Sequence, residues 1–264
     1  MIKVGFIGCG NMGGALAKAV SKAENVLVYL YDYNLEKAEE MAKNLNGKVS
    51  TSSEIVSVCD FVFLGVKPNV LPSVLNEIKN NLNANTTLIS MAAGVKISSI
   101  EEIISTNPII RIMPNTPVFV GSGMTVYASN LKVDSAKEQT FLDIMENTGK
   151  VDKLQEDLID SFCAVASCGP AFCYMFIEAL TKGGEKCGLP REKALLYASE
   201  MVKGSSYMVL KGDETPNKLR DNVCSPNGST IEGVKSLQKD GFDEIVENAV
   251  IASYNRTVEL GKQK

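Results

Sequence analysis

Three glycines near the N-terminal end of the sequence have the spacing of a phosphate-binding turn. Gly8, Gly10 and Gly13 form a Gly-x-Gly-x-x-Gly motif that includes Asn11 and Met12 and separates an apolar run from a helix-like run. In such a motif the first glycine permits a tight turn, the second lets the backbone approach a pyrophosphate, and the third lets the helix pack close to the strand. The N-terminus of the helix then offers N–H groups and partial positive charge to phosphates. The motif predicts a dinucleotide-binding turn, and the alternative is a structural strand-to-helix turn without phosphate.

A carboxylate follows the next apolar run. The run Val26–Tyr31 ends at Asp32, close to the position, about 20 residues after a glycine motif, at which an acid binds the adenosine ribose. Because a carboxylate there would accept hydrogen bonds from ribose hydroxyls and repel a 2′-phosphate, we expect a preference for NADH over NADPH. Asn34 and Lys37 lie near enough in the sequence to weaken that preference. The alternative is that Asp32 only caps the following helix.

A second segment with chemical potential lies far along the chain. Pro226, Asn227 and Gly228 predict a turn, and Ser229 and Thr230 then begin a helix. Free N–H groups at a helix start, beside two hydroxyls, form a site suited to a carboxylate. The alternative is an ordinary Ser/Thr N-cap.

The composition excludes several kinds of chemistry. The 264 residues include no histidine, which excludes Ser-His-Asp and Cys-His catalysis, histidine-ligated metals and a histidine general acid. Any proton that is moved must come from a carboxyl, a lysine, a tyrosine, a hydroxyl or water. The net charge of −4 argues against a nucleic-acid partner. The seven cysteines form no C-x-x-C pair, so we expect buried free thiols in a reducing cytoplasm and no metal site.

The first part of the chain alternates strand-like and helix-like runs, which predicts an α/β fold with an N-terminal, Rossmann-type, doubly wound parallel sheet. Strands are expected at residues 3–7, 26–31, 61–65, 87–91, 109–112 and 124–128. Helices are expected at residues 35–45, 70–82 and 97–104. Because ligands of such sheets bind at the carboxyl ends of the strands, the turns that follow the strands should line one cleft.

These turns supply further candidate cofactor contacts. Small side chains at Ala92 and Ala93 would let a flat ring approach the backbone, and residues 113–116 are expected at the same edge. Lys67 would either meet a ribose or a phosphate or be a solvated loop lysine, and both interpretations stay open. Beyond the glycine motif and Asp32, the predicted cofactor-binding residues are Val66, Lys67, Pro68, Met91, Ala92 and Ala93.

The second part of the chain keeps a helical pattern and loses the strand pattern. This change predicts a dinucleotide-binding domain at residues 1–152 and an all-α domain for substrate binding and dimerisation at residues 153–264. Long helices are expected at 171–187 and 191–210. Their apolar side chains, which include Met201, are too many for one small domain, so they should be buried within a bundle or against a second chain. We favour a subunit interface.

The least polar window, residues 162–180, contains Gly169 and Pro170 and has acidic residues near its ends. It fits a buried helix pair better than a membrane span. The first strand is expected to start at residue 2, so no signal peptide is predicted. We therefore expect a cytoplasmic protein without a membrane partner.

Six motifs in a fixed order carry a resemblance to a known family. They are residues 8–13, 66–68, 111–117, 167–172, 188–190 and 221–230. With these motifs, the chain resembles the pyrroline-5-carboxylate reductases over essentially its whole length. The last motif is close to diagnostic, although the family usually has a glycine at the position of Asn227. Asparagine tolerates the left-handed backbone region better than other non-glycine residues, so we expect the loop to keep its shape.

The resemblance implies reduction of 1-pyrroline-5-carboxylate to L-proline by hydride transfer from NAD(P)H, the last step of proline biosynthesis. A protonated cyclic imine needs little further activation, which suits a chain without histidine. In the family, the loop that matches Gly228, Ser229 and Thr230 holds the substrate carboxylate, and the threonine hydroxyl meets the ring nitrogen. The residues that match Glu156 and Asn222 lie near the substrate. The resemblance also implies a homodimer built through the C-terminal helices, which the family often assembles into decamers.

Two other functions compete with this interpretation. A β-hydroxyacid dehydrogenase-like oxidoreductase also joins a Rossmann domain to a helical domain, and it uses a catalytic lysine in a Gly-x-x-x-Lys helix. The comparable helix here carries residues 182–186, and that function would leave the segment 226–230 without a role. A non-catalytic NAD(P)-binding sensor is the other alternative, and the intact substrate loop argues against it.

Overall fold

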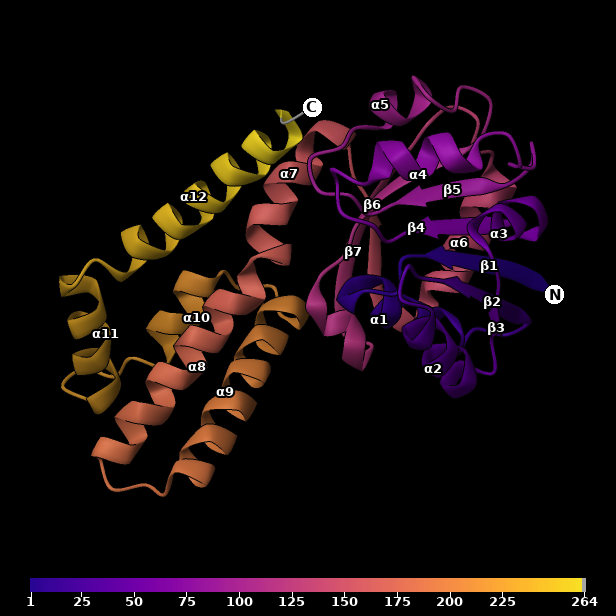
Figure 1. Ribbon diagram of the computed structural model, residues 1–264. Helices are drawn as coiled ribbons and strands as arrows, with labels where there is room; N and C mark the ends of the chain where they lie inside the picture. Colours follow the sequence, from indigo (N-terminus) through magenta and orange to yellow (C-terminus); the bar gives the residue numbers. More distant parts are fainter. Residues whose placement is uncertain (263–264) are drawn as a thin grey trace. The chain divides into compact units, whose positions relative to one another are not determined.

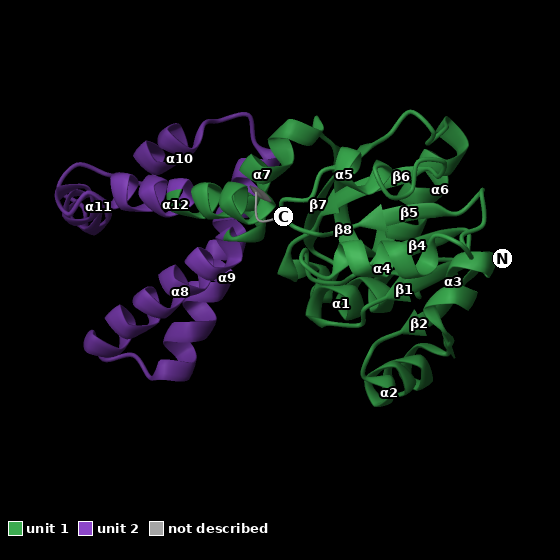
Figure 2. Cartoon of the chain, turned by 45° about the horizontal axis from the view of Figure 1, so that its top comes forward, with its two compact units in different colours: residues 1–168, 252–264 green, residues 169–251 purple. Residues whose placement is uncertain are grey.

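The computed structural model describes residues 1–262, which form two compact units (Figure 1 and Figure 2). The first unit joins Met1–Cys168 to the C-terminal segment that begins at Ala252, and the second unit is Gly169–Ile251. The last two residues of the predicted helical domain, 263 and 264, lie outside the described part of the chain. The chain therefore leaves the first unit once and completes that unit with its last helix.

The first unit contains an eight-stranded sheet in the order β3-β2-β1-β4-β5-β6-β7-β8. Strands β1 to β6 run parallel, β7 is antiparallel to β6, and β8 is parallel to β7. The predicted doubly wound fold is confirmed, with its last two strands reversed. The connection from β6 to β7 is short, whereas a parallel return needs a crossover of about a dozen residues or more. The strands are β1 (Ile2–Ile7), β2 (Val26–Tyr31), β3 (Lys48–Val49), β4 (Phe61–Leu64), β5 (Thr87–Ser90), β6 (Ile109–Met113), β7 (Gly123–Ser129) and β8 (Gly149–Lys153).

Helices cover both faces of this sheet. They are α1 (Asn11–Val20), α2 (Leu35–Leu45), α3 (Ser52–Val58), α4 (Leu71–Ile78), α5 (Ile97–Glu101) and α6 (Ser135–Met145). Because side chains alternate along a strand, β4 sends Phe61 and Phe63 into the cluster under α1, α2 and α6, and Val62 and Leu64 into the cluster under α3, α4 and α5. Phe63 stacks on Phe6 of β1 with ring centroids 4.6 Å apart. A sheet buried on both faces explains why its strands read as continuous apolar runs.

The predicted elements of this unit are confirmed to within a few residues. Helix α2 matches its predicted bounds, whereas α4 and α5 end earlier than predicted. Four elements were not predicted: β3, α3, α6 and β8. Strands β3 and β8 read as polar, with sequences KV and GKVDK whose side chains are mostly exposed, and α3 is only two turns long.

A chain of short helical segments completes the first unit after β8. It consists of η3 (Glu156–Leu158), α7 (Ile159–Phe162) and the π-helical turn η4 (Cys163–Ser167). The N–H of Cys168 donates to the Cys163 carbonyl at 2.9 Å, the wide hydrogen bond that defines this turn. Ile159 and Cys163 are buried in the same cluster as the apolar side chains of α4 and α5.

The second unit is helical. It contains α8 (Gly169–Lys186), α9 (Arg191–Lys211), α10 (Pro216–Asn222), α11 (Ser229–Lys239) and the first half of α12 (Phe242–Lys262). Helices α8 and α9 pair closely, and Arg191 at the start of α9 donates to Glu178 at 2.9 Å and to Glu185 at 3.0 Å. The two long helices predicted from the sequence are confirmed.

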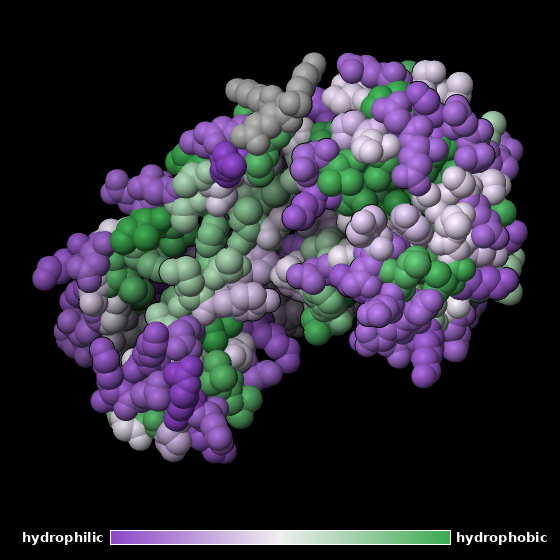
Figure 3. Space-filling model, in the orientation of Figure 1, coloured by the Kyte–Doolittle hydropathy of each residue, from purple (hydrophilic) through white to green (hydrophobic). Residues whose placement is uncertain are grey.

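Much of the apolar surface of this second unit is exposed. Met201, Tyr207 and Met208 on α9 are 45%, 61% and 57% exposed, and hydrophobic residues gather on the surface over α8 and α12 in Figure 3. The predicted alternative in which these side chains are buried within a bundle of the same chain is therefore wrong. By length and composition alone, the helical stretch Glu156–Lys186 would suffice to cross a membrane.

Candidate active site

The glycine motif forms a turn in which backbone packs directly against backbone. Gly8, which follows β1, has a φ of +98°, and its carbonyl oxygen is covered from two sides. A Cβ added to Gly13 would lie 2.2 Å from that oxygen, and a Cβ added to Gly65, which follows β4, would lie 2.5 Å from it. The turn geometry predicted for Gly8 and Gly13 is confirmed, and Gly65 is a third essential glycine that the sequence analysis did not single out.

Gly10 differs from these glycines because it packs against nothing. A Cβ added there would meet no atom within 4 Å. Gly10 is the N-cap of α1, and within the described part of the chain no side chain caps this helix start. The first N–H groups of α1, from Asn11 and Met12 onward, therefore lie at an open surface with the positive end of the helix dipole. This cradle fits a pyrophosphate.

Asp32 is tied to the glycine motif by its own carboxylate. One oxygen accepts from the Cys9 N–H at 2.7 Å, and the other accepts from the Asn34 N–H at 3.0 Å. The side chain that caps α2 belongs to Asn34, which accepts from the Lys37 N–H at 3.3 Å. The alternative in which Asp32 caps this helix is therefore wrong. Each carboxylate oxygen keeps a lone pair for a further donor such as a ribose hydroxyl.

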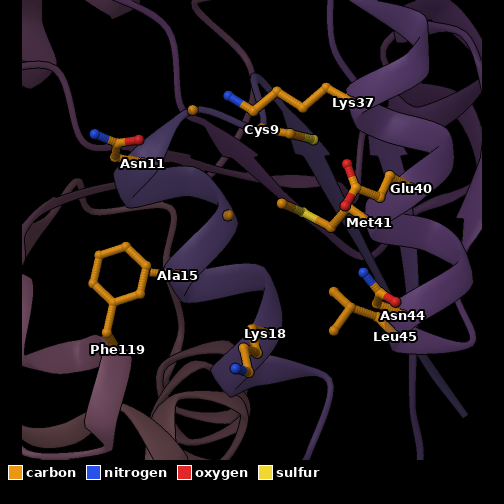
Figure 4. A pocket seen from close by; sticks show the side chains of 12 residues that line it. Cys9, Asn11, Ala15, Lys18, Lys37, Glu40, Met41, Asn44, Leu45 and Phe119 are labelled. Carbon is orange, nitrogen blue, oxygen red and sulfur yellow. The ribbon is translucent and has the colours of Figure 1, made fainter.

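A pocket of about 610 Å³ opens beside this turn, between α1 and α2 (Figure 4). Its lining includes Gly10 and Asn11 at the start of α1 and Lys37 and Met41 of α2. In Figure 4 the Lys37 side chain extends toward Cys9 and the start of α1. The Lys37 ammonium group and the Asp32 carboxylate thus both lie beside the glycine turn. They shift the pKa of the Cys9 thiol in opposite directions: Asp32 raises it and Lys37 lowers it.

The buried thiol of Cys9 is a poor nucleophile near neutral pH. Burial, and secondarily the Asp32 carboxylate, raise the pKa of Cys9 to about 11. Burial likewise raises the pKa of Cys59 to about 12, with the Asp60 carboxylate adding to the shift. Because the thiolate is the nucleophilic form, both side chains are structural. All seven cysteines are free, as predicted, but the prediction that they are buried holds only for Cys9, Cys59 and Cys163, and it is wrong for Cys187, which is exposed.

The carboxyl ends of the parallel strands meet at one edge, as predicted. The register places Ile7 of β1 beside Leu64 of β4, Leu64 beside Ser90 of β5, and Ser90 beside Arg111 of β6. The turns that follow these strands contain the predicted cofactor residues Val66, Lys67, Pro68, Met91, Ala92 and Ala93. The Lys67 side chain is exposed, so the structure leaves both interpretations of this lysine open.

The segment after β6 connects the edge of the sheet to the π-helical turn. The Asn115 amide donates to the Ala166 carbonyl at 3.0 Å, and its carbonyl oxygen accepts from the Met124 N–H at 2.8 Å. The Ser167 hydroxyl donates to the Pro114 carbonyl at 2.9 Å. These side chains hold the backbone of residues 114–115 against that of Met124 and Ala166.

Glu156 contacts two groups of its own unit. One of its oxygens accepts from the Ile97 N–H at the start of α5, at 2.7 Å, and lies 3.5 Å from Arg111. Arg111 is 1% exposed and also pairs with Asp160 at 2.7 Å. Arg111 is thus a buried anchor for η3 and α7. Its sequence signals are a single cation within the apolar run of β6 and its place in the motif at residues 111–117, and neither of them predicts this role. The role predicted for Glu156 near the substrate stays a prediction.

In the second unit, the loop before α11 keeps the predicted shape. Asn227 adopts the left-handed region with a φ of 59°, and the Gly228 N–H donates to the Ser225 carbonyl at 3.0 Å. Gly228 is the N-cap of α11, and no side chain of the described residues caps this helix. Ser229 and Thr230 are therefore the first two residues of α11, and both side chains are exposed. The alternative of an ordinary Ser/Thr N-cap is wrong.

Asn222 also belongs to the second unit, where it is the last residue of α10. Its amide donates to Glu214 at 2.7 Å and its side chain is exposed. The hydrogen bond braces the loop that leads into α10. The predicted contact between Asn222 and a substrate stays a prediction.

The fold and the turn at its carboxyl edge define a Rossmann-type dinucleotide-binding protein with a helical second unit. Residues 156–260 match the family described as pyrroline-5-carboxylate reductase dimerisation, and residues 3–94 match the family described as NADP oxidoreductase, coenzyme F420-dependent. The chain belongs to the pyrroline-5-carboxylate reductase family.

The similarity to individual members extends over nearly the whole chain. Human pyrroline-5-carboxylate reductase 2 is 36% identical, over 98% of this chain and 84% of the relative. The Escherichia coli K12 pyrroline-5-carboxylate reductase is 34% identical over 98% of both chains. The crystal structure of Plasmodium falciparum pyrroline carboxylate reductase with NADP bound is 37% identical, covers 99% of this chain and 98% of that one, and has a TM-score of 0.90.

Proposed function

We propose that the protein reduces 1-pyrroline-5-carboxylate to L-proline, with NAD(P)H as the hydride donor. One observation on this member of the family carries the proposal. Helices α1 and α11 both begin at a glycine N-cap, and no side chain of the described residues caps either of them. One suits the phosphates of a dinucleotide and the other suits the carboxylate of a small acid.

The first unit would hold the cofactor. The N–H groups of Gly10, Asn11 and Met12 would bind the pyrophosphate. Gly8 and Gly13 would give the turn its shape, because the Gly8 N–H already donates to the Tyr31 carbonyl at 2.8 Å. Asp32 would accept hydrogen bonds from the adenosine ribose. Val66, Lys67, Pro68, Met91, Ala92 and Ala93 would line the rest of the site. When it is bound, the dinucleotide supplies the hydride.

The loop before α11 would hold the substrate. The N–H groups of Gly228, Ser229 and Thr230 would bind the carboxylate, and the Thr230 hydroxyl would orient the ring nitrogen. Glu156 and Asn222 would lie near the substrate. Their oxygens and N–H groups that make no hydrogen bond in this structure would be available to it. Positioning and electrostatics account for the catalysis, because a protonated imine is already a good hydride acceptor.

The exposed apolar helices point to a second copy of the chain as partner. We propose a division into a cofactor domain at 1–152 and a substrate and dimerisation domain at 153–264, a homodimer through α8 and α9, and assembly into a decamer. The apolar stretch Glu156–Lys186 falls within the match to the dimerisation family. It would therefore bury its side chains against a second copy and not in a membrane, in a protein of the cytoplasm without a nucleic-acid partner.

The choice of cofactor is proposed from the side chains around the glycine turn. The position of Asp32 favours NADH, because its carboxylate borders the N–H groups of Cys9 and Asn34 and would repel a 2′-phosphate. Lys37, which lines the adjacent pocket, works in the opposite direction. We therefore expect a mild preference for NADH.

A steady-state assay tests the function and the cofactor together. The purified protein should consume NADH and NADPH when 1-pyrroline-5-carboxylate is added and should not oxidise 3-hydroxyisobutyrate with NAD⁺ or NADP⁺. Activity with the hydroxyacid alone would identify a β-hydroxyacid dehydrogenase instead. Binding of NAD(P)H with no turnover of either substrate would identify a sensor.

A further inference from the structure

The turn after β5 is in direct backbone contact with the C-terminal end of α12, within the first unit. A Cβ added to Gly261 would lie 2.6 Å from the Gly94 carbonyl oxygen, and a Cβ added to Gly94 would lie 2.6 Å from the Gly261 Cα. Ordinary contacts to a Cβ begin at about 3.4 Å. The two backbones therefore touch at a crossing that admits no side chain from either residue.

The turn itself makes few contacts of its own: the Ala92 N–H donates to the Ser90 hydroxyl at 3.4 Å, and the Ala92 methyl group is buried. The Val95 N–H donates to the Ala92 carbonyl at 3.3 Å, and Gly94 has a φ of +73°, as the third residue of a type II turn requires. Between Ala92 and Gly94 no side chain is longer than a methyl group. At Gly94, which has no side chain, the position of the turn therefore depends on the backbone that packs against it.

Helix α12 is well anchored where it meets the turn. Thr257 is 6% exposed, its hydroxyl donates to the Ser253 carbonyl at 2.9 Å, and it lies 3.9 Å from the Cys163 sulfur. The Thr257 carbonyl oxygen is 3.2 Å from the position of an added Gly94 Cβ. Cys163 and Ala92 belong to one buried cluster, so the helix, the π-helical turn and the β5 turn form a continuous packed region.

We propose that Gly261 is a positioning residue for the cofactor: its contact with Gly94 sets the position of the turn formed by Ala92, Ala93 and Gly94 at the carboxyl edge of the sheet. The inference rests on the proposed function, in which Ala92 and Ala93 border the cofactor. A side chain at position 261 must move the turn or the helix by about 1 Å. A misplacement of about 1 Å in a positioning element can lower a rate by about 100-fold.

Variants of increasing size at this position test the proposal. Gly261→Ala should weaken NAD(P)H binding about threefold, and Gly261→Val about tenfold or more, with cofactor affinity measured directly by fluorescence titration. The KM for 1-pyrroline-5-carboxylate at saturating cofactor should change less than twofold, which a general loss of structure would not produce. Gly233→Ala on α11 is the matched control, because a Cβ at that helical glycine meets no atom within 4 Å and α11 lies outside the proposed α8 and α9 interface.

A chain shortened to end at Leu260 is the second variant, since it removes the contact without adding a side chain. It should also bind NAD(P)H several-fold more weakly, because the turn loses its support. Parental cofactor affinity in both Gly261→Val and the shortened chain would overturn the positioning role. A parent protein that neither binds NAD(P)H nor reduces the imine would instead overturn the proposed function, so the two failures are distinguishable.

Discussion

The glycine turn of the first unit and the loop before α11 in the second unit both lead to a helix with a glycine N-cap, but they differ in how closely the residues around that N-cap are packed. Each leads to a helix whose N-cap is a glycine in extended conformation, Gly10 with ψ −172° and Gly228 with ψ 170°. Around the first, Gly13 and Gly65 press against the Gly8 carbonyl, and Cys9 is fully buried. Around the second, the side chains of the loop and of the first helical residues are mostly exposed.

This difference separates two ways of making an anion site. In the glycine turn the binding surface is backbone, and its geometry is fixed by close packing, so affinity and stability depend on the same atoms. In the α11 loop the hydroxyl of Thr230 is exposed, so its chemistry can be changed with little cost in stability. Substitutions at the closely packed glycines of the first region, such as Gly13, should therefore change affinity and stability together, whereas substitutions in the second region should change affinity alone.

The largest effect is expected at Gly13. Gly13→Ala places a Cβ 2.2 Å from the Gly8 carbonyl oxygen, which should lower the free energy of unfolding by about 1–3 kcal/mol and weaken cofactor binding by about 100-fold. Gly10→Ala is the matched control, because its Cβ meets open space: it should keep the parental melting temperature and weaken only cofactor binding. Thermal unfolding and cofactor titration check both, and a parental melting temperature in Gly13→Ala would contradict the packing argument.

Thr230 should show the opposite behaviour. Thr230→Ala should lower kcat/KM for 1-pyrroline-5-carboxylate about tenfold or more, because a hydrogen bond to a charged group contributes about 1.5–3 kcal/mol. The melting temperature should stay unchanged, since the side chain is exposed. Thr230→Ser keeps the hydroxyl and should retain most of the activity. Parental kinetics in Thr230→Ala would eliminate the proposed catalytic role.

A smaller effect is expected at Asp32. Asp32→Ser removes the charge that would oppose a 2′-phosphate, so the ratio of kcat/KM for NADPH to that for NADH should rise several-fold. The loss of the carboxylate contacts to Cys9 and Asn34 should also lower the free energy of unfolding by about 1 kcal/mol. Tyr33→Ser, at a side chain that is 98% exposed, controls for changes elsewhere in the loop. A parent enzyme that favours NADPH tenfold or more would show that Asp32 does not select the cofactor.

The smallest effect concerns thiol reactivity in the two regions. With iodoacetamide at pH 8, Cys224 beside the α11 loop and the exposed Cys187 should be alkylated well before Cys9. The pKa of Cys9 is raised to about 11 by burial, so its thiol stays protonated at pH 8 and forms thiolate only as the pH approaches that value. Peptide mass spectrometry gives the rates. Alkylation of Cys9 as fast as that of Cys187 would show that the glycine turn opens readily.

The fold was largely accessible to sequence analysis because its strands and α2 have clear periodic patterns. The residues that escaped prediction depend on partners far along the chain. Gly65 matters only because Gly8 lies opposite it, and Arg111 matters because Asp160 pairs with it. No local pattern encodes such contacts.

The candidate site was accessible only as a set of motifs. Its glycines, hydroxyls and Asp32 are identifiable because turn and helix-start chemistry is local. Two details of the site depend on backbone torsions at single positions. One is the hydrogen bond from the Cys9 N–H to Asp32, and the other is that Gly228, not a hydroxyl residue, is the N-cap of α11. Neither torsion follows from residue type.

The first unit is discontinuous, and this has a consequence for the order in which the protein is made. The second unit is inserted between Cys168 and Ala252, so Gly94 must wait for the final helix before its contact with Gly261 can form. During synthesis, the β5 turn emerges long before α12 and lacks this support until α12 has also left the ribosome. Contacts of such large sequence separation slow folding. A nascent chain that is released before α12 would therefore contain all eight strands of the sheet and still lack the contact that completes the proposed cofactor site.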